Sequence, residues 1–185
     1  MKRPPSPHAF PLVLTDSDME EARAGALARQ EFAERDGLKN KTCIRADAER
    51  VAAESNRAKD LEKHFKGACG ELALARKLGV RWDWNVGGDR KKPDVAHIDI
   101  RTASRLDGGL IIYPNDIRFR PHSLIVGTAP ELWFVGWIYG IDGMTRRYLR
   151  ESGPYRGNYI IPQADLWLWP IPVQRFPYPY RKDAA

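Results

Sequence analysis

The sequence predicts one α/β (α+β) domain, in which helices flank a mixed sheet and an extra helical layer lies towards the N-terminus. The chain has 185 residues, of which 43% are hydrophobic and six are Trp, so it is long enough to enclose a proper core. Helical periodicity marks the residues before Gly79, whereas short apolar runs alternate with turn residues after it. We expect an extended segment over 1–14, one domain over 15–165, and a Pro- and aromatic-rich extension over 166–185.

Two helices are expected to form the extra layer, over residues 15–66. Ser17-Asp18-Met19-Glu20 has the capping-box pattern, and the charged, Ala-rich run after it stops at Gly37, which predicts a helix of about twenty residues. A second, amphipathic helix is indicated by small or apolar residues that recur every three or four positions. These residues are Ile44, Ala48, Val51, Ser55, Ala58, Leu61 and Phe65.

The core of the domain, over 67–165, is expected to begin with a third helix from Gly67 to Leu78. Glu71 shares one face of this helix with the apolar residues Leu74 and Ala75. Because burying a lone carboxylate is costly, Glu71 requires either water at the rim of the core or a cationic partner, such as a metal ion or a basic side chain. The alternative is a Glu placed near a helix N-terminus, where the macrodipole favours it.

Strands are expected after Gly79, joined by tight, Gly-containing turns into a mostly antiparallel sheet, with a short helix over Met144–Glu151. In the C-terminal extension, Leu and Trp alternate before a Pro-rich stretch, so we expect it to run extended and pack on the domain. The alternatives for this segment are a surface that stacks on nucleic-acid bases and a ligand for a partner. The expected strands are 80–86, 98–102, 110–113, 124–127 and 132–138.

The charge of the chain permits a polyanionic partner. The net charge is +6 and the isoelectric point is about 9.4. The excess is local, because residues 39–81 carry eleven basic and six acidic side chains, and residues 144–185 carry seven basic and three acidic ones. These two segments could frame a groove that binds phosphates, and the alternative is a solvated helix face with a basic tail.

The most informative segment runs from Lys92 to Thr102 and contains two carboxylates and a cation at the spacing of a metal site on a strand. In an extended strand, Asp99 and Arg101 project to one side, while Ile98, Ile100 and Thr102 project to the other side and are free to pack. Pro93 stiffens the approach to Asp94, and a bend between the two acids would bring both carboxylates within reach of one hard cation.

These residues resemble a known family. Asp94 followed by Asp99-Ile100-Arg101 resembles the core signature of the PD-(D/E)xK nuclease superfamily, and Gly67-Ala68-Cys69-Gly70-Glu71 resembles the helix start that often precedes it. Residues 109–116 and 134–138 are similar to strands of uncharacterised, phage-type members, so that the resemblance covers about residues 61 to 165. It implies a restriction-endonuclease-like fold with an αβββ core, and a Mg²⁺-dependent (or Mn²⁺-dependent) nuclease that hydrolyses phosphodiester bonds in DNA.

The resemblance also implies roles for individual residues. Asp94 and Asp99 would ligate the metal together with the main-chain carbonyl of Ile100, and Glu71 would contribute directly or through water. Arg101 stands where the family has lysine. Because arginine stays protonated, Arg101 cannot act as a general base, but it can position water or stabilise charge on the phosphate.

Several alternatives stay open at this point. Arg101 could form an ion pair with Asp99, which would leave a catalytically inactive nuclease fold that binds nucleic acid or a protein partner. Asp89 is a second candidate for the upstream acid, and His97 is either a ligand or base or, more simply, a structural histidine. The basic residues beside the site are expected either to contact DNA phosphates or to be solvated loop charges. They are Lys91, Lys92 and Arg105.

The remaining composition bears on compartment and partners. Cys43 and Cys69 are the only cysteines, which indicates neither a disulfide framework nor a structural zinc site, and Cys69 is expected to pack. No apolar run has the length of a signal peptide or a membrane span, so we expect a cytoplasmic protein without a membrane partner. DNA is the expected partner, and a homo-oligomer or a protein partner is compatible with the sequence.

Overall fold

The computed structural model describes residues 6–35, 46–84, 86–87 and 92–171, and for residues 46–55 it describes the backbone alone. Two long helices, two sheets and three short helices make up this part of the chain. In chain order they are β1 (Phe10–Val13), α1 (Asp16–Arg35), α2 (Ala46–Leu78), β2 (Asp99–Ala103), β3 (Leu110–Ile112), β4 (Pro121–Thr128), β5 (Glu131–Tyr139), α3 (Gly140–Gly143), a 3₁₀ helix (Arg146–Tyr148), β6 (Tyr159–Ile161) and a second 3₁₀ helix (Gln163–Asp165).

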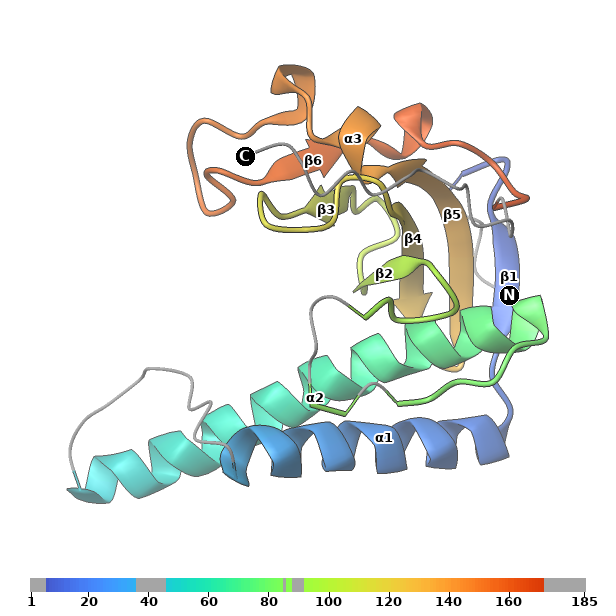
Figure 1. Ribbon diagram of the computed structural model, residues 1–185. Coiled ribbons are helices and arrows are strands. Elements are labelled where there is room, and N and C mark those ends of the chain that lie inside the picture. Colours follow the sequence, from blue (N-terminus) through green and yellow to red (C-terminus); the bar gives the residue numbers. More distant parts are fainter. Residues whose placement is uncertain (1–5, 36–45, 85, 88–91, 172–185) are drawn as a thin grey trace, which may run out of the picture.

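The main sheet has the strand order β1-β5-β4-β2 (Figure 1). β5 is antiparallel to both β1 and β4, whereas β2 is parallel to β4. The expectation of a mixed sheet is therefore confirmed. The αβββ order is present along the chain, but β3 leaves the main sheet and pairs antiparallel with β6 in a separate, two-stranded sheet. β2 and β4 thus become parallel neighbours, because the connection through β3 carries the chain back to the same end of the sheet.

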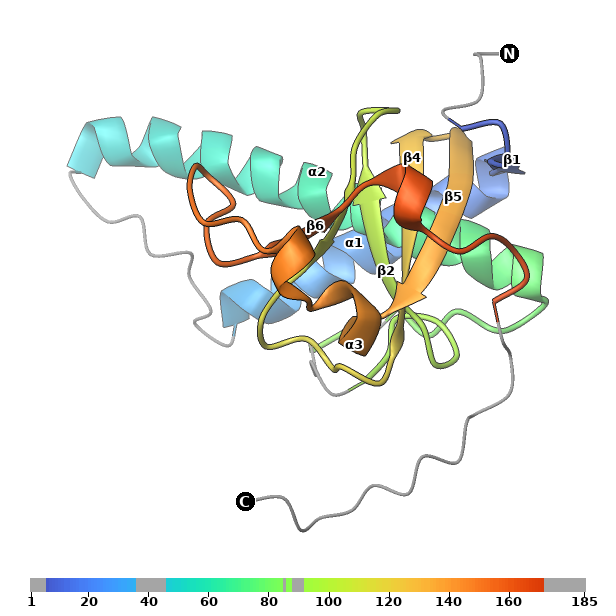
Figure 2. The same ribbon diagram turned by 90° about the horizontal axis from the view of Figure 1, so that it is seen from above.

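The molecule is layered. α2 crosses one face of the main sheet and α1 packs on α2, while the small β3–β6 sheet lies over the other face (Figures 1 and 2). One buried cluster, which includes Leu72, Ile98 and Phe134, joins the helices to the sheet. A second cluster, which includes Leu110 and Leu124, joins the main sheet to the small one. The helical layer is therefore part of the same packed unit as the sheet.

The helix that carries Glu71 does not begin at Gly67, so this expectation is wrong. α2 runs without interruption for 33 residues. Gly70 serves packing instead, because a Cβ atom at this position would lie 2.1 Å from Oγ1 of Thr102. A glycine here allows the helix to approach β2 closely. The expected inward direction of Ile98, Ile100 and Thr102 is confirmed by the same contact and by the burial of both isoleucines.

Substituting Ala for Gly70 is expected to destabilise the protein by about 1–2 kcal/mol. The added methyl group overlaps Thr102, which costs about 1–3 kcal/mol in a packed core, and the better helix propensity of Ala returns up to about 1 kcal/mol. Thermal unfolding measures the change. The double variant Gly70→Ala/Thr102→Ala removes the overlapping atoms and should recover most of the loss, and an unchanged melting temperature of Gly70→Ala alone would contradict the close approach.

The first helix has the expected length but a different cap. Thr15 and Asp18 form the reciprocal pair: the Asp18 N–H donates to Oγ1 of Thr15 (3.2 Å), and the Thr15 N–H donates to Oδ2 of Asp18 (3.0 Å). The capping-box prediction for Ser17 and Glu20 is wrong by two residues. Thr15 is the cap because it precedes the first helical turn and its side chain reaches the free N–H groups there.

Three other expectations about elements are corrected. Residues 10–13 are not a segment outside the domain, since they form an edge strand that pairs Phe10 with Phe134 and Val13 with Glu131. The described part of 80–86 contains no strand, and Trp82 is instead buried in the core. In place of one helix over Met144–Glu151, the chain forms α3 just before this range and a 3₁₀ turn within it.

The C-terminal extension packs on the domain as far as the structure describes it. Trp167 and Trp137 exchange main-chain hydrogen bonds of 2.8 and 2.9 Å, and their rings lie edge to face. Leu166 and Ile171 are buried. Residues 172–185, which include the aromatic-proline repeats, lie outside the described residues, as do Gly37 and Cys43.

Candidate functional site

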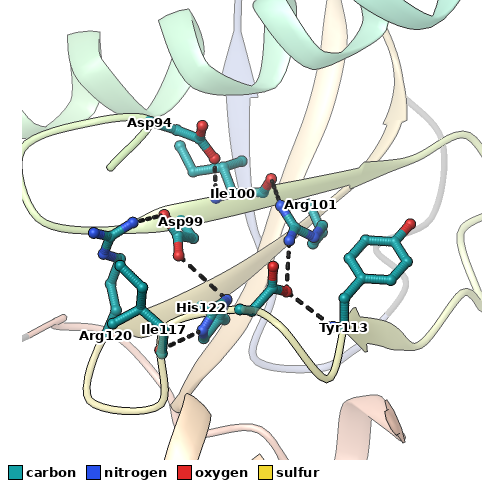
Figure 3. A network of polar contacts seen from close by, with 9 residues as sticks. Asp94, Asp99, Ile100, Arg101, Tyr113, Ile117, Arg120 and His122 are labelled. Carbon is teal, nitrogen blue, oxygen red and sulfur yellow. Dashed lines mark hydrogen bonds and ion pairs between the residues drawn. The ribbon is translucent and has the colours of Figure 1, made fainter. Parts of the chain in front are cut away.

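Asp94 lies beside β2 because the chain turns sharply between the two acidic residues. The Asp94 N–H donates to the carbonyl of Ile98 (3.1 Å), the Ile98 N–H donates to the carbonyl of Val95 (2.9 Å), and Ala96 has a φ of 54°. The turn carries the chain back on itself, so that Oδ2 of Asp94 accepts a hydrogen bond from the Ile100 N–H (2.7 Å) (Figure 3). The bend expected between Asp94 and Asp99 is thus present.

The carbonyl of Ile100 lies on the same edge of β2 as Asp94. In a strand, the N–H and C=O of one residue point to the same edge. Since the Ile100 N–H binds Asp94 rather than β4, the Ile100 carbonyl also points away from β4, and among the described residues no further strand pairs with this edge. The carbonyl accepts a long hydrogen bond from Nη1 of Arg101 (3.4 Å). A carboxylate and a main-chain carbonyl therefore share this edge of the sheet.

Asp99 lies on the face of β2 that is turned away from α2. Its Oδ1 accepts a hydrogen bond from Nη1 of Arg120 (2.7 Å), and its Oδ2 lies 3.7 Å from Nδ1 of His122. Burial raises the pKa of Asp99 to about 6, Arg120 opposes the increase, and the negative charge of Asp94 adds to it. Asp99 is thus a buried carboxylate that exchanges its proton close to neutral pH.

Arg101 does not pair with Asp99, so the ion pair weighed as an alternative is wrong. Its Nη2 binds Oδ2 of Asp116 (2.7 Å), and its guanidinium lies over the ring of Tyr113, 5.2 Å from the centroid. Oδ2 of Asp116 also accepts a hydrogen bond from the Tyr113 N–H (2.9 Å), which fixes the carboxylate in the loop between β3 and β4 (Figure 3). This fixed carboxylate draws Arg101 away from Asp99, whose partner is Arg120 instead.

His122 completes the cluster from β4, where it lies next to Asp99 in the strand register. Its ring is fully buried, and Nε2 lies 3.2 Å from the carbonyl of Ile117. Burial lowers the pKa of His122 to about 4, so the ring is neutral at pH 7. A carbonyl only accepts hydrogen bonds, so Nε2 carries the proton and Nδ1 presents its lone pair towards Oδ2 of Asp99.

Asp116, Arg120 and His122 were missed by reasoning from the sequence. They belong to the segment from Asp116 to His122, in which polar and charged residues alternate with apolar ones just before a strongly apolar stretch. Charged residues at the start of a buried strand indicate a site at the end of the sheet, and this signal was present in the sequence. Which partners they take was not visible there, since Arg120 and Asp99 are 21 residues apart.

Glu71 lies within α2, far from its N-terminus, so the macrodipole explanation is wrong. Both oxygens bind Arg29, with 3.0 Å between Nη1 and Oε1 and a second, shorter bond from Nη2 to Oε2, and Nε1 of Trp82 donates to Oε2 (3.0 Å). Burial raises the pKa of Glu71, Arg29 opposes the increase, and the charge of Asp94 adds to it. Of the partners expected for Glu71, which were water at the rim, a metal ion or a basic side chain, the structure shows a basic side chain, Arg29 from α1.

Asp94 links the two other acidic groups, because its charge raises the pKa of both Glu71 and Asp99. The three carboxylates expected at the site therefore occupy one electrostatic neighbourhood, although they come from α2, from the turn and from β2. Within the described residues, no group of three or more Asp, Glu, His or Cys side chains is arranged to hold a metal ion.

The basic residues expected to contact DNA lie at the surface, as far as they are described. Lys92 pairs with Asp83 (2.5 Å) and Arg105 pairs with Asp107 (2.7 Å). Lys91 and the alternative acid Asp89 lie outside the described residues. His97 is in the turn before β2, so it does not continue the alternation of Asp99 and Arg101.

Comparisons with protein-family models, with curated proteins and with solved structures gave no match to this chain. In the described part of the chain, no helix combines the length and the apolar character needed to cross a membrane.

Proposed function

We propose that the protein is a Mg²⁺-dependent nuclease of the PD-(D/E)xK type, with a restriction-endonuclease-like core, that hydrolyses phosphodiester bonds in DNA. The observation that carries the proposal is the hydrogen bond from the Ile100 N–H to the Asp94 carboxylate. Through it, the upstream acid meets the centre of the Asp99-Ile100-Arg101 segment, so that parts of the motif that are separate in the sequence adjoin in space. The net charge of +6 suits a polyanionic substrate.

The donor atoms at this edge of the sheet fit a hard divalent cation. They are all oxygens: the Asp94 carboxylate and the Ile100 carbonyl lie at the edge, and the Asp99 carboxylate lies on the adjoining face of β2. Mg²⁺ is commonly held by one or two carboxylates and otherwise keeps water and substrate phosphate, so it needs no cluster of three acidic side chains. Mn²⁺ shares the preference for oxygen. When bound, the ion would neutralise charge on the scissile phosphate and activate a water molecule.

Arg101 is suited to the phosphate. Asp116 and the ring of Tyr113 hold its guanidinium in place, so little entropy is lost when its other N–H groups bind a phosphate oxygen. Arginine keeps its proton, and Arg101 therefore positions and stabilises the phosphate but accepts no proton from water.

Glu71 acts as a positioning residue in this proposal. Both of its oxygens are engaged by Arg29, and Nε of Arg29 donates to the carbonyl of Trp84 (2.6 Å). The pair thus anchors the loop that follows α2, the same loop that leads on to Asp94. Burial and the charge of Asp94 both raise the pKa of Glu71, and a cation nearby would relieve the repulsion between the two carboxylates.

Incubation of plasmid DNA with the purified protein tests the proposal. Cleavage is expected with Mg²⁺ or Mn²⁺ and is expected to stop when EDTA is added, and calorimetry is expected to register binding of the metal alone. If neither ion binds and the plasmid stays intact, the proposed nuclease function is wrong.

The second candidate is a catalytically inactive nuclease fold that binds nucleic acid or another protein. The observation that favours it is that Glu71 and Asp99 each bind an arginine, Arg29 and Arg120, which neutralises two of the three acidic groups. The Arg101→Lys variant separates the candidates, because it supplies the family's lysine. If Arg101→Lys cleaves DNA faster than the wild type in the presence of metal, the nuclease is supported. If both the wild type and the variant bind DNA but neither cleaves it, the inactive module is supported.

The affinity for Mg²⁺ is expected to rise by up to about tenfold between pH 5 and pH 7. The pKa of Asp99 is raised to about 6, so the carboxyl is mostly protonated at pH 5 and mostly ionised at pH 7, and only the ionised form is a ligand. Calorimetric titrations with Mg²⁺ at several pH values measure this dependence. Equal affinity at pH 5 and pH 7 would show that Asp99 takes no part in binding.

A further inference from the structure

A groove of about 730 Å³ opens beyond the C-terminal end of β2. It lies between α2, the small β3–β6 sheet and the loop that precedes β6, and Ala103 and Ser104 line it where β2 ends. Ala103 is four residues from Asp99, which corresponds to about 13 Å along an extended strand. The groove is therefore separate from the acidic site but continues the line of the strand that carries it.

Basic side chains from three different elements line the groove. Lys66 comes from α2, Arg105 follows β2, and Arg150 precedes β6. Asp107 is the acidic residue among the lining side chains, and it pairs with Arg105. This pair is exposed, with 81% and 72% of the two side chains accessible, so water screens it and a phosphate can compete for Arg105. Three cations and one carboxylate give the groove a positive potential.

The floor of the groove is apolar and aromatic. Ile111 and Ile160 are paired in the register of the small sheet and both line the groove, while their neighbours Ile112 and Ile161 point into the second buried cluster. Tyr155 also lines the groove, 48% of it is exposed, and it lies close enough to Arg105 to affect the pKa of that residue. Charged rims above an apolar, aromatic floor suit a ligand with phosphates on one side and flat apolar groups on the other.

We propose that this groove binds an unpaired strand of DNA, with phosphates on Lys66, Arg105 and Arg150 and bases on Tyr155 and the isoleucine floor. In a duplex the bases stack on each other and their faces are not available, whereas an unpaired strand presents both a backbone and free base faces. This inference rests on the proposed nuclease function, because the groove would select the form of DNA that reaches Asp99 along β2. The substrate is accordingly a single strand or the unpaired end of a duplex.

Fluorescence anisotropy with a labelled single-stranded oligonucleotide, and with the duplex of the same sequence, tests the proposal. The full chain is used in EDTA, so that no DNA is cleaved. The single strand is expected to bind at least about tenfold more tightly than the duplex. Tyr155→Ala is expected to weaken binding of the single strand by about tenfold, as the loss of one stacked base does, while Tyr155→Phe retains the affinity.

Two of the basic residues at the rim of the groove, Lys66 and Arg150, are tested in the same assay. Lys66→Ala and Arg150→Ala are each expected to lower the slope of affinity against salt concentration by about 1, as the loss of one phosphate contact does. Arg81→Ala, which removes an exposed arginine outside the groove, is the matched control and should leave the slope unchanged. Equal binding of duplex and single strand, or a Tyr155→Ala variant with unchanged affinity, would overturn the proposal.

The failure of this inference is distinguishable from the failure of the nuclease proposal. Asp94→Asn removes a carboxylate outside the groove, so the variant is expected to bind the single strand as the wild type does. If the protein binds single strands through Tyr155 but never cleaves DNA, the proposal for the groove is supported and the nuclease proposal is wrong. If the protein cleaves DNA but its affinity for single strands does not depend on Tyr155, Lys66 or Arg150, the nuclease proposal is supported and the proposal for the groove is wrong.

Discussion

Asp94→Asn is expected to reduce metal-dependent DNA cleavage at least about 100-fold. The substitution removes one negative charge from the two carboxylates proposed to hold the cation, and losing one such electrostatic contact to the reacting centre commonly costs two to three orders of magnitude in rate. Asparagine has nearly the same shape, and its carbonyl oxygen can still accept the hydrogen bond from the Ile100 N–H. The fold should therefore be retained while the metal ligand is lost. Initial rates of plasmid cleavage measure the effect.

The matched control is Asp165→Asn, which removes a carboxylate that pairs with Arg147 at the surface. This variant is expected to cleave DNA at the rate of the wild type. Asp99→Asn should be as inactive as Asp94→Asn, and the double variant should lose little more, because ligands of one ion act as a unit. If Asp94→Asn is folded, as judged by circular dichroism, and cleaves DNA at the normal rate, Asp94 takes no part in the catalytic site.

Glu71→Gln is expected to destabilise the protein by about 3–5 kcal/mol. Arg29 and Glu71 are buried, with 13% and 8% of their side chains accessible, and removing one charge of such a pair leaves the other without compensation in the interior. Trp82 and Trp84 are held by the same pair, so the loop after α2 loosens as well. For a chain of this length the melting temperature should fall by about 6–20 °C. Thermal or urea unfolding in EDTA measures the change.

Two further variants make this prediction specific to the buried pair. Glu34→Gln, which removes an exposed partner of Arg57, should change the stability by less than about 1 kcal/mol. The double variant Arg29→Met/Glu71→Leu replaces both charges by apolar side chains of similar size and should recover part of the loss, since Trp82 and Trp84 still lose these hydrogen bonds. If Glu71→Gln were as stable as the wild type in EDTA but no longer bound Mg²⁺, Glu71 would be a metal ligand and the role given to Arg29 would be wrong.

The local geometry of the candidate site was predictable from the sequence, and the partners of its residues were not. The alternation of Asp99 and Arg101 against Ile98, Ile100 and Thr102 follows from the two-residue period of a strand, and the bend after Pro93 follows from local turn chemistry. Partner choice depends on residues far away in the chain. Arg29 and Glu71 are 42 residues apart, and no local pattern links them.

The ion pair weighed between Asp99 and Arg101, which does not form, illustrates why proximity in sequence is a poor guide to ion pairing. The two side chains share one face of β2, and yet each binds a residue of the loop before β4, Arg120 and Asp116 respectively. The loop carries both charges to the end of the sheet, where each forms a contact of 2.7 Å with its partner on β2. The charged residues of this loop are visible in the sequence. The position of the loop over β2 depends on the parallel pairing of β2 with β4.

The sequence by itself determined the helical layer, four of the six strands in the described part of the chain and the faces of β2, because these follow from periodicities of two and 3.6 residues that any short window contains. Only the tertiary structure decided that α2 is one continuous helix, that Phe10–Val13 joins the sheet, that β3 leaves it, and which arginine neutralises each buried acid. The physical reason is the separation along the sequence of the residues that interact. Hydrogen bonds within a turn or helix are settled by neighbouring residues, whereas pairing of strands and ions is settled by the packing of segments that meet only after the whole chain has folded.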